Sequence, residues 1–416
     1  MTRASRIAIT GSGAITPLGM SADASWRQYL AGESGIRGLA QPWAGTLPCR
    51  IAGQVGADLD PLLDPLLRRR LDRCSQLGLL AAREAWAQAG LHRGGDGARV
   101  AVVVGCGIGG LDTMGRQART LDRSGASRVS PLTVPMLIPN AAAAQISIDL
   151  GLHGGAHTPV SACASSAEAL LWGQMLLTLD RADVVLAGGS EAPVNELGLV
   201  GFSAMRALST RNDEPMEACR PYGQGRDGFV LAEGAGLLVL EREDDARARG
   251  ADCLGYLLEV GCSSDAHHIA TPDPEGRQAA AAMSQALQRC GLLPKDLAFL
   301  QAHATGTVLG DLAEARAIRL ALGQVSDGLP VTAPKGQLGH LLGGAGAVET
   351  ILALRCLASG LLPPSRNADP LDPAVDLAVV QGSPHHLVPS GTGRFALKNA
   401  FGFGGHNFSL VMQAAG

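Results

Sequence analysis

The chain has 416 residues, a formal net charge of −4, and many glycines but few aromatic residues, which suits two domains or one large α/β body of two similar halves. The charge gives no indication of a nucleic-acid partner, no apolar run reaches the ~18 residues of a membrane span, and the N-terminus lacks a signal-peptide pattern. We therefore expect a soluble, cytoplasmic protein with no nucleic-acid or membrane partner.

The first half of the chain alternates buried strands with amphipathic helices. It opens with RIAITGSGAITPLG, a predicted strand followed by a glycine-rich turn, and VVVGCGIGG follows at 102–110. Neither segment completes the dinucleotide-binding glycine spacing, so we interpret both as structural turns. Continuous apolar strands are predicted at 99–105, 183–189 and 235–241, with a helix over 77–90. Buried parallel strands between helices indicate a layered α/β fold.

The pattern starts again after about residue 251. A strand is predicted at 253–261, a helix over 277–290, further strands from 297 and at 330–334, and a helix over 345–357. The order of strand, small-residue turn and helix occurs around Cys163 and again from His340 to Cys356. We predict two related halves, residues 1–251 and 252–416, in one compact body, because no low-complexity linker separates them.

The nine cysteines form no CxxC pair and no zinc-like Cys/His spacing. Free thiols in a reducing compartment are therefore expected. The pairs His267-His268 and His385-His386 lack further ligand types at metal spacing, so no metal site is predicted.

Cys163 lies in TPVSACASSAEALLWG, where a predicted strand ends and a helix begins. The unpaired amides and dipole of a helix N-terminus favour a thiolate, so we expect the pKa of this cysteine to be lowered. The small neighbours of Cys163 permit a sharp turn and close approach of a substrate. A packed core cysteine is the alternative on position alone.

Two histidines stand in similar small-residue loops. His303, in QAHATGTVLGD, follows a predicted strand, and His340, in PKGQLGHLLGGAGA, precedes a predicted helix. One such histidine is most often structural, but two of them with a cysteine at a helix N-terminus indicate a site at the strand ends. A thiol nucleophile with two imidazoles suits acyl transfer.

Four blocks, VSACASSAEAL, HATGT, KGQLGHLLGGAGA and NAFGFGGHN, resemble the signature blocks of the β-ketoacyl-[acyl carrier protein] synthases. A segment between them, RALSTRNDEP…CRPYGQGRDGFVLAEGAG, matches as well, so the resemblance covers essentially the whole chain. It is greatest to the type II elongating enzymes of fatty acid synthesis and their polyketide relatives. The resemblance implies a thiolase-like α/β/α/β/α fold and an acyltransferase, most like EC 2.3.1.179.

The resemblance also implies roles for individual residues. Cys163 takes the acyl group, and malonyl carrier is then decarboxylated and condensed with it to give 3-oxoacyl carrier. His303 and His340 donate hydrogen bonds to the malonyl thioester oxygen, and Lys335 is paired with Glu314. The remaining implied roles are an oxyanion hole from the backbone of Cys163 and Phe403, a gate at Phe403, pantetheine contacts from Thr305 and Thr307, and an acyl pocket lined by Ile108.

The implied partner is an acyl carrier protein, which brings the phosphopantetheine, so no cofactor is expected on this chain. A carrier is acidic, and Arg68 and Arg69, in a basic run with Arg70 and Arg73, are candidate docking residues together with Arg206. A solvated helix face is the alternative for the basic run. A homodimer, or a heterodimer with a related ketosynthase-like subunit, is expected.

One position departs from the family pattern: His406 follows GFGG, where Thr or Ser is usual. This difference bears on acyl preference more than on the reaction. Two other classes are alternatives. A thiolase needs a second catalytic cysteine late in the chain, and the last cysteine is Cys356 in a predicted helix. A chain-length-factor subunit lacks the nucleophile, whereas a catalytic subunit that pairs with such a factor remains an alternative.

Overall fold

The computed structural model describes residues 6–92, 97–387 and 394–415. Ten strands form one hydrogen-bonded sheet in the order β10-β9-β13-β14-β8-β1-β7-β6-β4-β5. Their bounds are β1 Ile7–Ile15, β4 Val100–Gly105, β5 Ala156–His157, β6 Val184–Glu191, β7 Gly234–Arg242, β8 Gly255–Ser264, β9 Leu297–Gln301, β10 Val331–Thr332, β13 Phe395–Gly402 and β14 His406–Ala414. Two small ladders lie outside it, β2 (Ile36–Gly38) with β3 (Ile51–Gly53) and β11 (Leu361–Leu362) with β12 (His385–His386).

The large sheet consists of two halves with the same strand order and directions. In the first half β5, β4 and β6 pair in parallel, and β6-β7 and β7-β1 pair antiparallel. In the second half β10, β9 and β13 pair in parallel, and β13-β14 and β14-β8 pair antiparallel. A short antiparallel ladder between β1 and β8 joins them. The two related halves are therefore confirmed, while the boundary at residue 251 stays a prediction.

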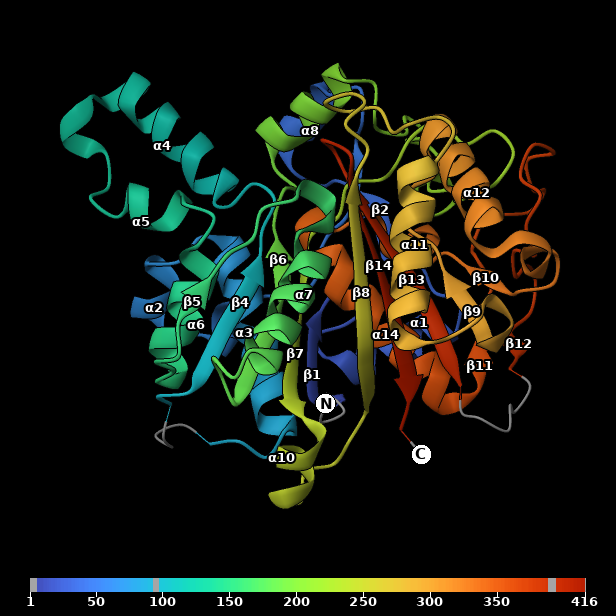
Figure 1. Cartoon of the computed structure of the whole chain (residues 1–416). Coiled ribbons are helices and arrows are strands. Elements are labelled where there is room, and N and C mark those ends of the chain that lie inside the picture. The colour runs from blue at the N-terminus through green and yellow to red at the C-terminus, as the bar shows by residue number, and fades with distance from the viewer. Residues whose placement is uncertain (1–5, 93–96, 388–393, 416) are drawn as a thin grey trace.

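Helices form three layers around the two half-sheets (Figure 1). Helices α3 and α6 cover the first half-sheet, α11 and α12 cover the second, and α7 and α14 lie between them, each in contact with strands of both halves. This is the predicted α/β/α/β/α arrangement. The helices are α1 Ala22–Leu30, α2 Pro65–Arg69, α3 Arg73–Gln88, α4 Leu111–Ser124, α5 Thr133–Leu137, α6 Ala141–Leu150, α7 Ser165–Thr178, α8 Glu196–Ala204, α9 Pro215–Ala218, α10 Glu243–Ala248, α11 Arg277–Cys290, α12 Val308–Leu322, α13 Lys335–Leu338 and α14 Ala345–Ser359.

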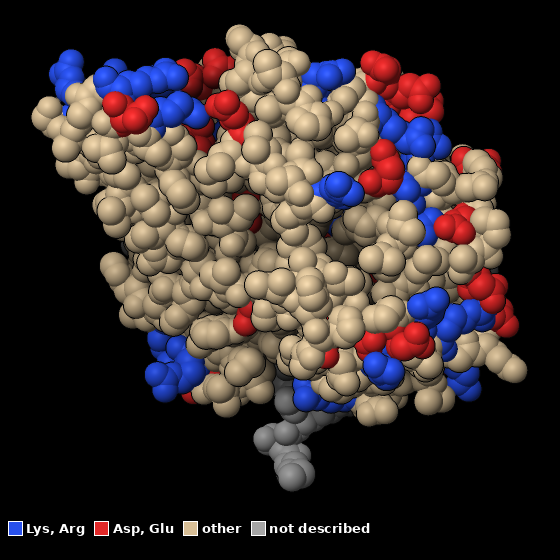
Figure 2. Space-filling model, turned by 90° about the horizontal axis from the view of Figure 1, so that it is seen from above, with Lys and Arg blue, Asp and Glu red and all other residues tan. Residues whose placement is uncertain are grey.

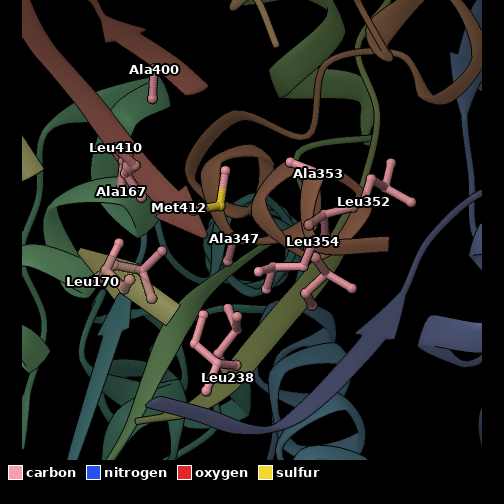
Figure 3. Close-up of a cluster of buried hydrophobic side chains, with 14 of the residues drawn as sticks. Ala167, Leu170, Leu238, Ala347, Leu352, Ala353, Leu354, Ala400, Leu410 and Met412 are labelled. Carbon is pink, nitrogen blue, oxygen red and sulfur yellow. The ribbon is translucent and has the colours of Figure 1, made fainter. Parts of the chain in front are cut away.

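The central helix pair is packed through small residues. A Cβ atom on Gly346 of α14 would lie 2.8 Å from the backbone nitrogen of Ala167 of α7, so only glycine permits this approach. Figure 3 shows the surrounding core, where Leu170 and Leu352 from the helices meet Leu238 and Leu410 from the strands. Fully burying one such side chain contributes about 1.5–3 kcal/mol. Abundant Gly and Ala thus bring the helices that follow the Cys163 and His340 loops close together.

Two local predictions differ from the structure. The glycines of GSGAI do not make a turn but continue β1. Gly11 and Gly13 let α3 pack directly on the strand, because Cβ atoms added to them would lie 2.2 and 2.1 Å from carbonyl oxygens of α3. The strand before Cys163 is also shorter than predicted, since β5 ends at His157 and Pro159, which follows, has no N–H to donate to a ladder. The helix predicted over 277–290 is α11.

One stretch of the described chain, Leu342–Ser359, is long and apolar enough by composition to cross a membrane, contrary to the expectation from the sequence. However, 83% of this stretch is buried inside the fold, where it forms the end of the His340 loop and helix α14. Burial of this kind is typical of the core helix of a globular body.

Candidate active site

Cys163 lies in a short 3-10 turn, Ala162–Ala164, directly before helix α7. Ala162 has a φ of 52°, in the left-handed region, and the Ser165 hydroxyl stabilises the turn by accepting from Ser161 N and donating to Ala162 O. The second half repeats this geometry in Leu342–Gly344 before α14, with a φ of 45° at Leu342. The repeat predicted around Cys163 and His340 is confirmed, and the cysteine does stand at a helix start.

The protonation of Cys163 differs from the prediction. Burial raises the pKa of the thiol to about 12, although the charge of Lys335 and hydrogen bonds from the backbone N–H groups of Phe403 and Cys163 lower it. The side chain is 7% exposed and belongs to an apolar cluster, so desolvation outweighs the helix start. The expectation of a lowered pKa is therefore wrong, and the resting residue is a thiol. The same two N–H groups are those predicted to form the oxyanion hole.

His303 follows β9 in a loop held by Glu314 of α12. The two carboxylate oxygens of Glu314 accept from the backbone N–H groups of His303 and Ala304, at 2.9 and 2.7 Å, and Asn399 also donates to Glu314 at 3.0 Å. Burial, together with the positive charge of Lys335, holds the pKa of His303 well below its usual value. The imidazole is therefore neutral near pH 7 and carries one N–H donor.

His340 faces His303 in the site. Their ring centroids lie 5.5 Å apart at an angle of 84°, and Phe229 packs edge-on against His340 at 5.2 Å. The backbone of His340 bonds to Val230 and Ala232, which fixes the loop. Burial also lowers the pKa of His340 well below its usual value. Two neutral imidazoles thus lie side by side, both able to donate without bringing charge into the site.

Lys335 is buried next to His303, but the predicted ion pair between Lys335 and Glu314 is wrong. Its ammonium lies 2.5 Å from a carboxylate oxygen of Glu349 in α14, and it donates to the carbonyl oxygen of His303 at 2.5 Å. Glu314 is occupied by the backbone of the His303 loop instead. The signal for Glu349 was in the sequence: it is the one acidic residue inside the apolar helical run AGAVETILAL.

A pocket of about 380 Å³ brings most of the predicted residues together. Cys163, His303, His340 and Phe403 all line it. Thr305 and Thr307 line it too, with their hydroxyl oxygens 3.0 Å apart. The exposed residue Arg206 also lines it. Figure 2 shows a hollow between mostly uncharged residues on the upper face of the molecule. A nucleophile, two neutral donors and a pair of threonines therefore share one cavity.

The loop that carries Phe403 is built for tight turning. Gly404 and Gly405 have φ values of +87° and +77°, and a Cβ on Gly402 would lie 2.3 Å from Ser161 O in the cysteine loop. His406 begins β14, partly buried, with its ring against Gly404. Among the described residues, the pocket lining includes its neighbours Gly405 and Asn407 but not His406. His406 thus lies outside the pocket lining, next to the loop that carries Phe403. A gate at Phe403 stays a prediction.

Ile108 packs on the apolar cluster that includes Cys163, but it is not among the described residues that line the pocket. Its loop is anchored by Glu191, which accepts from the backbone N–H groups of Gly107 and Ile108 at 2.6 and 3.2 Å. A place for Ile108 in an acyl pocket therefore stays a prediction.

Beside this anchor Cys74, Cys106 and Glu191 have their ligand-type atoms within 4.8 Å of one another. The Cys74 and Cys106 sulfurs are 3.6 Å apart, and Cys106 donates to Glu191 at 3.3 Å. This buried chain of hydrogen bonds accounts for the cluster, and Glu191 is already engaged by backbone donors. That the chain carries no metal stays a prediction.

The predicted docking arginines do not form one patch. Arg206 is exposed, with a φ of 54°, and lines the pocket mouth. Arg69 is exposed on α2, Arg68 is paired with Asp60, and Arg73 is paired with Glu233. The sequence interpretation did not consider three exposed arginines on α4, Arg116, Arg119 and Arg123, a helix that projects from the body in Figure 1. Two of them are ion-paired, Arg116 with Asp112 and Arg119 with Glu196.

The amino-acid sequence matches a known protein family over most of its length. Residues 4–246 match the model of the β-ketoacyl synthase N-terminal domain, and residues 254–369 match that of the C-terminal domain. The 3-oxoacyl-[acyl-carrier-protein] synthase 2 of Mycobacterium bovis is 40% identical over 408 residues, 97% of this chain and 96% of that protein. The synthase of the same name from Staphylococcus aureus is 38% identical over 99% of both chains.

Solved structures agree with these sequence matches. A β-ketoacyl synthase from Burkholderia phymatum is similar with a TM-score of 0.91 at 30% identity, over 99% of this chain and 100% of that one. An acyl-carrier protein complex of a type II polyketide ketosynthase bound to the hexaketide has a TM-score of 0.91 at 26% identity, over all of both chains. A ketosynthase in complex with its chain length factor from Xenorhabdus doucetiae has a TM-score of 0.84 at 29% identity, over 99% and 98%.

Proposed function

The chain belongs to the β-ketoacyl synthase family, and from this premise we propose how its pocket performs the family's reaction. The enzyme is an acyltransferase that condenses an acyl group with malonyl-[acyl carrier protein] to give 3-oxoacyl-[acyl carrier protein], of the type EC 2.3.1.179. The observation that carries the assignment of residues is the single pocket that holds Cys163, His303, His340 and Phe403.

In the first half-reaction, Cys163 attacks an acyl thioester of the carrier. The sulfur loses its proton as the C–S bond forms, and the neutral imidazoles of His303 and His340 line the same cavity as acceptors. The negative charge that develops on the thioester oxygen is met by the backbone N–H groups of Cys163 and Phe403. Collapse of this intermediate expels the carrier thiolate, which takes up the proton that the imidazole accepted from Cys163. The acyl group stays on Cys163, and both imidazoles are again neutral.

In the second half-reaction, malonyl carrier enters and loses carbon dioxide. The electron pair of the broken C–C bond becomes an enolate, whose oxygen accepts hydrogen bonds from His303 and His340. Because both imidazoles are neutral, each donates one N–H to the enolate oxygen without bringing a positive charge of its own into the site. The enolate carbon attacks the acyl thioester of Cys163, and the sulfur leaves. Thr305 and Thr307 would hold the pantetheine arm, which belongs to the carrier, so the chain needs no cofactor of its own.

The partners we propose are an acyl carrier protein and a second ketosynthase-like subunit. The outer edge of β5 ends the described sheet, and the segments that precede and follow β5 in the chain carry exposed apolar side chains: Val134 62%, Ile148 74%, Val160 52%, Trp172 41% and Met175 48%. Apolar surface of this extent indicates an interface. The occupant is a second copy of this chain, and a chain-length factor is the alternative. We propose the cytoplasm as the compartment.

The thiolase alternative needs a second catalytic cysteine, and Cys163 is the only cysteine among the described residues that line the pocket. Cys356 is fully buried in α14 and, among the described residues, does not line the pocket. The chain-length-factor alternative fails because the nucleophile and both histidines are present in one cavity. What remains open within the family is a catalytic subunit that works with such a factor.

Replacing the nucleophile tests the assignment. Cys163→Ala puts one small residue for another in a tight turn, so we expect the fold to survive and acylation by acyl carrier to be lost. Intact-protein mass spectrometry after incubation with acyl carrier measures the adduct. Cys219→Ala, a buried cysteine that is not part of the described pocket lining, is the matched control and should acylate fully. Full acylation of Cys163→Ala would reject the assignment.

A further inference from the structure

A second lysine lies in the interior beside the catalytic groups. Lys398, on β13, is fully buried, and its ammonium lies 3.1 Å from one carboxylate oxygen of Glu349. The other oxygen of Glu349 holds Lys335 at 2.5 Å. One buried carboxylate therefore holds two ammonium groups, one on each of its oxygens.

This charge lies one contact away from the reacting groups. Lys335 donates to the carbonyl oxygen of His303, and its ammonium is 3.5 Å from Nδ1 of the same residue. Lys398 also acts on the site through its field, since its charge lowers the pKa of both His303 and His340. The sequence of contacts runs from Lys398 through Glu349 and Lys335 to His303.

Few charged groups act on Lys398 within the described part of the chain. The charged groups that face it are Glu349 on α14, Lys335 on α13 and, further away, Glu314 on α12. On the neighbouring strand β9, Gln301 pairs in register with Lys398 and is neutral, and its side-chain oxygen has no hydrogen-bond partner within the described chain. Burying a charged lysine costs folding free energy, and only a well-placed partner offsets this cost. A buried lysine therefore indicates a structural or catalytic role.

We propose that Lys398 is a positioning residue of the condensation site: it binds one oxygen of Glu349 while Lys335 binds the other, so that the Lys335 ammonium stays on the His303 loop. Its positive charge near the site also favours the enolate. The proposal rests on the proposed function of the pocket. It concerns decarboxylation and condensation, not the acylation of Cys163, and among the described residues Lys398 does not line the pocket.

The pH dependence follows from the charge of Lys398. Burial lowers the pKa of Lys398 to about 8. Below pH 8 the lysine is protonated and its positive charge is present, whereas above pH 8 the proton and that charge are lost. The decarboxylation rate should therefore fall as pH rises through about 8. We expect a decrease of about tenfold, smaller than the 10²–10³ that follows removal of a direct oxyanion donor.

The test measures carbon dioxide release from malonyl carrier between pH 6.5 and 9.5 in the wild type, Lys398→Met and Lys398→Arg. Lys398→Met should stay at the low rate at every pH, with an unchanged KM and a lower kcat. Lys398→Arg should keep the high rate to the top of the range, because its charge is not lost. Cys163 acylation should be equal in all three. Leu410→Val, opposite Lys398 on β14, is the control for core disturbance and should keep the wild-type profile.

Melting temperatures separate loss of fold from loss of charge. Replacing a buried ion-paired group with an apolar one is often neutral or stabilising, and Glu349 keeps Lys335 as a partner, so Lys398→Met should fold. A Lys398→Met enzyme whose rate still falls near pH 8 would overturn the proposal, and so would a Lys398→Arg enzyme as slow as Lys398→Met. A wild-type enzyme that releases no carbon dioxide would instead reject the function itself.

Discussion

The two histidines of the site differ in their supports, although they share one task. His303 is tied through its backbone to Glu314 and Lys335, whereas His340 is held by backbone bonds to Val230 and Ala232. Each ring is free to aim one N–H into the pocket. Because the pKa values of both lie well below the usual range, both rings stay neutral near pH 7, with one N–H donor each.

We expect His303→Ala and His340→Ala each to slow malonyl decarboxylation by on the order of 10²–10³ while acylation of Cys163 changes far less. In the wild type the rate should not fall between pH 7 and 6, since neither imidazole gains a proton there. Radiolabelled carbon dioxide release and intact mass, measured on the same preparations, check both statements. A variant that releases carbon dioxide at the wild-type rate would show that its histidine is not a donor in this step.

At the scale of elements, the loop from Cys106 to Gly110 is held in place by hydrogen bonds close to the nucleophile Cys163. Its backbone is fixed by Glu191, whose own carboxylate also accepts from Gly343 in the His340 loop at 3.3 Å. The β-branched side chain of Ile108 is stiff at χ1 and lies in the apolar cluster with Cys163. A change at Ile108 should therefore alter the space near the sulfur without moving the loop.

Ile108→Gly should ease acylation by bulky or long acyl carriers, and Ile108→Phe should restrict acylation to short chains. One misplaced methylene in such a pocket is worth roughly 1–3 kcal/mol, or about 10–200-fold in selectivity. The measurement is the ratio of acylation rates for long and short carriers, together with the melting temperature. If both variants melted earlier with an unchanged ratio, Ile108 would be a packing residue only.

The sequence predicted the elements around the site well, and it predicted the charged interior poorly. Helix α11 and the turn before α7 follow from periodicity and small residues, which are local properties. The partner of Lys335 depends on which helix packs against the His303 loop, and this is a tertiary contact. The sequence interpretation therefore assigned Glu314 as the partner, whereas the structure has Glu349. The pKa of Cys163 was misjudged for a related reason: the helix start is local, but the burial that dominates comes from the whole cluster.

A signal for the missed residues was nevertheless present. Glu349 interrupts an apolar helix and Lys398 interrupts the strand FALKNAFG, and both are buried. Opposite charges inside two apolar runs predict that the runs meet. A buried charge without a partner costs too much folding free energy. The amino-acid pattern alone therefore predicts that Glu349 and Lys398 pair, and that α14 contacts β13.

At the scale of the whole molecule, the pocket opens at the end that also carries the exposed arginines. Arg206 is exposed and lines the pocket, and helix α4 projects from the upper end of the body, where α8 also lies (Figure 1). An acidic carrier has to bring its pantetheine arm to this mouth, so opposite charge around it would increase the rate of productive encounter, an effect that salt screens. Arg69, on α2, is exposed but is not among the described residues that line the mouth.

We predict that Arg206→Glu raises KM for acyl carrier and malonyl carrier about tenfold or more at low salt, with little change for a small acyl thioester that needs no dock. Arg69→Glu should have a similar but smaller effect if α2 belongs to the dock. Lys295→Glu is the matched control, because Lys295 precedes β9 and therefore lies at the end of that strand away from His303. Steady-state kinetics at two salt concentrations make the comparison. Equal losses with carrier and small thioester would mean that Arg206 shapes the pocket mouth and does not bind the carrier.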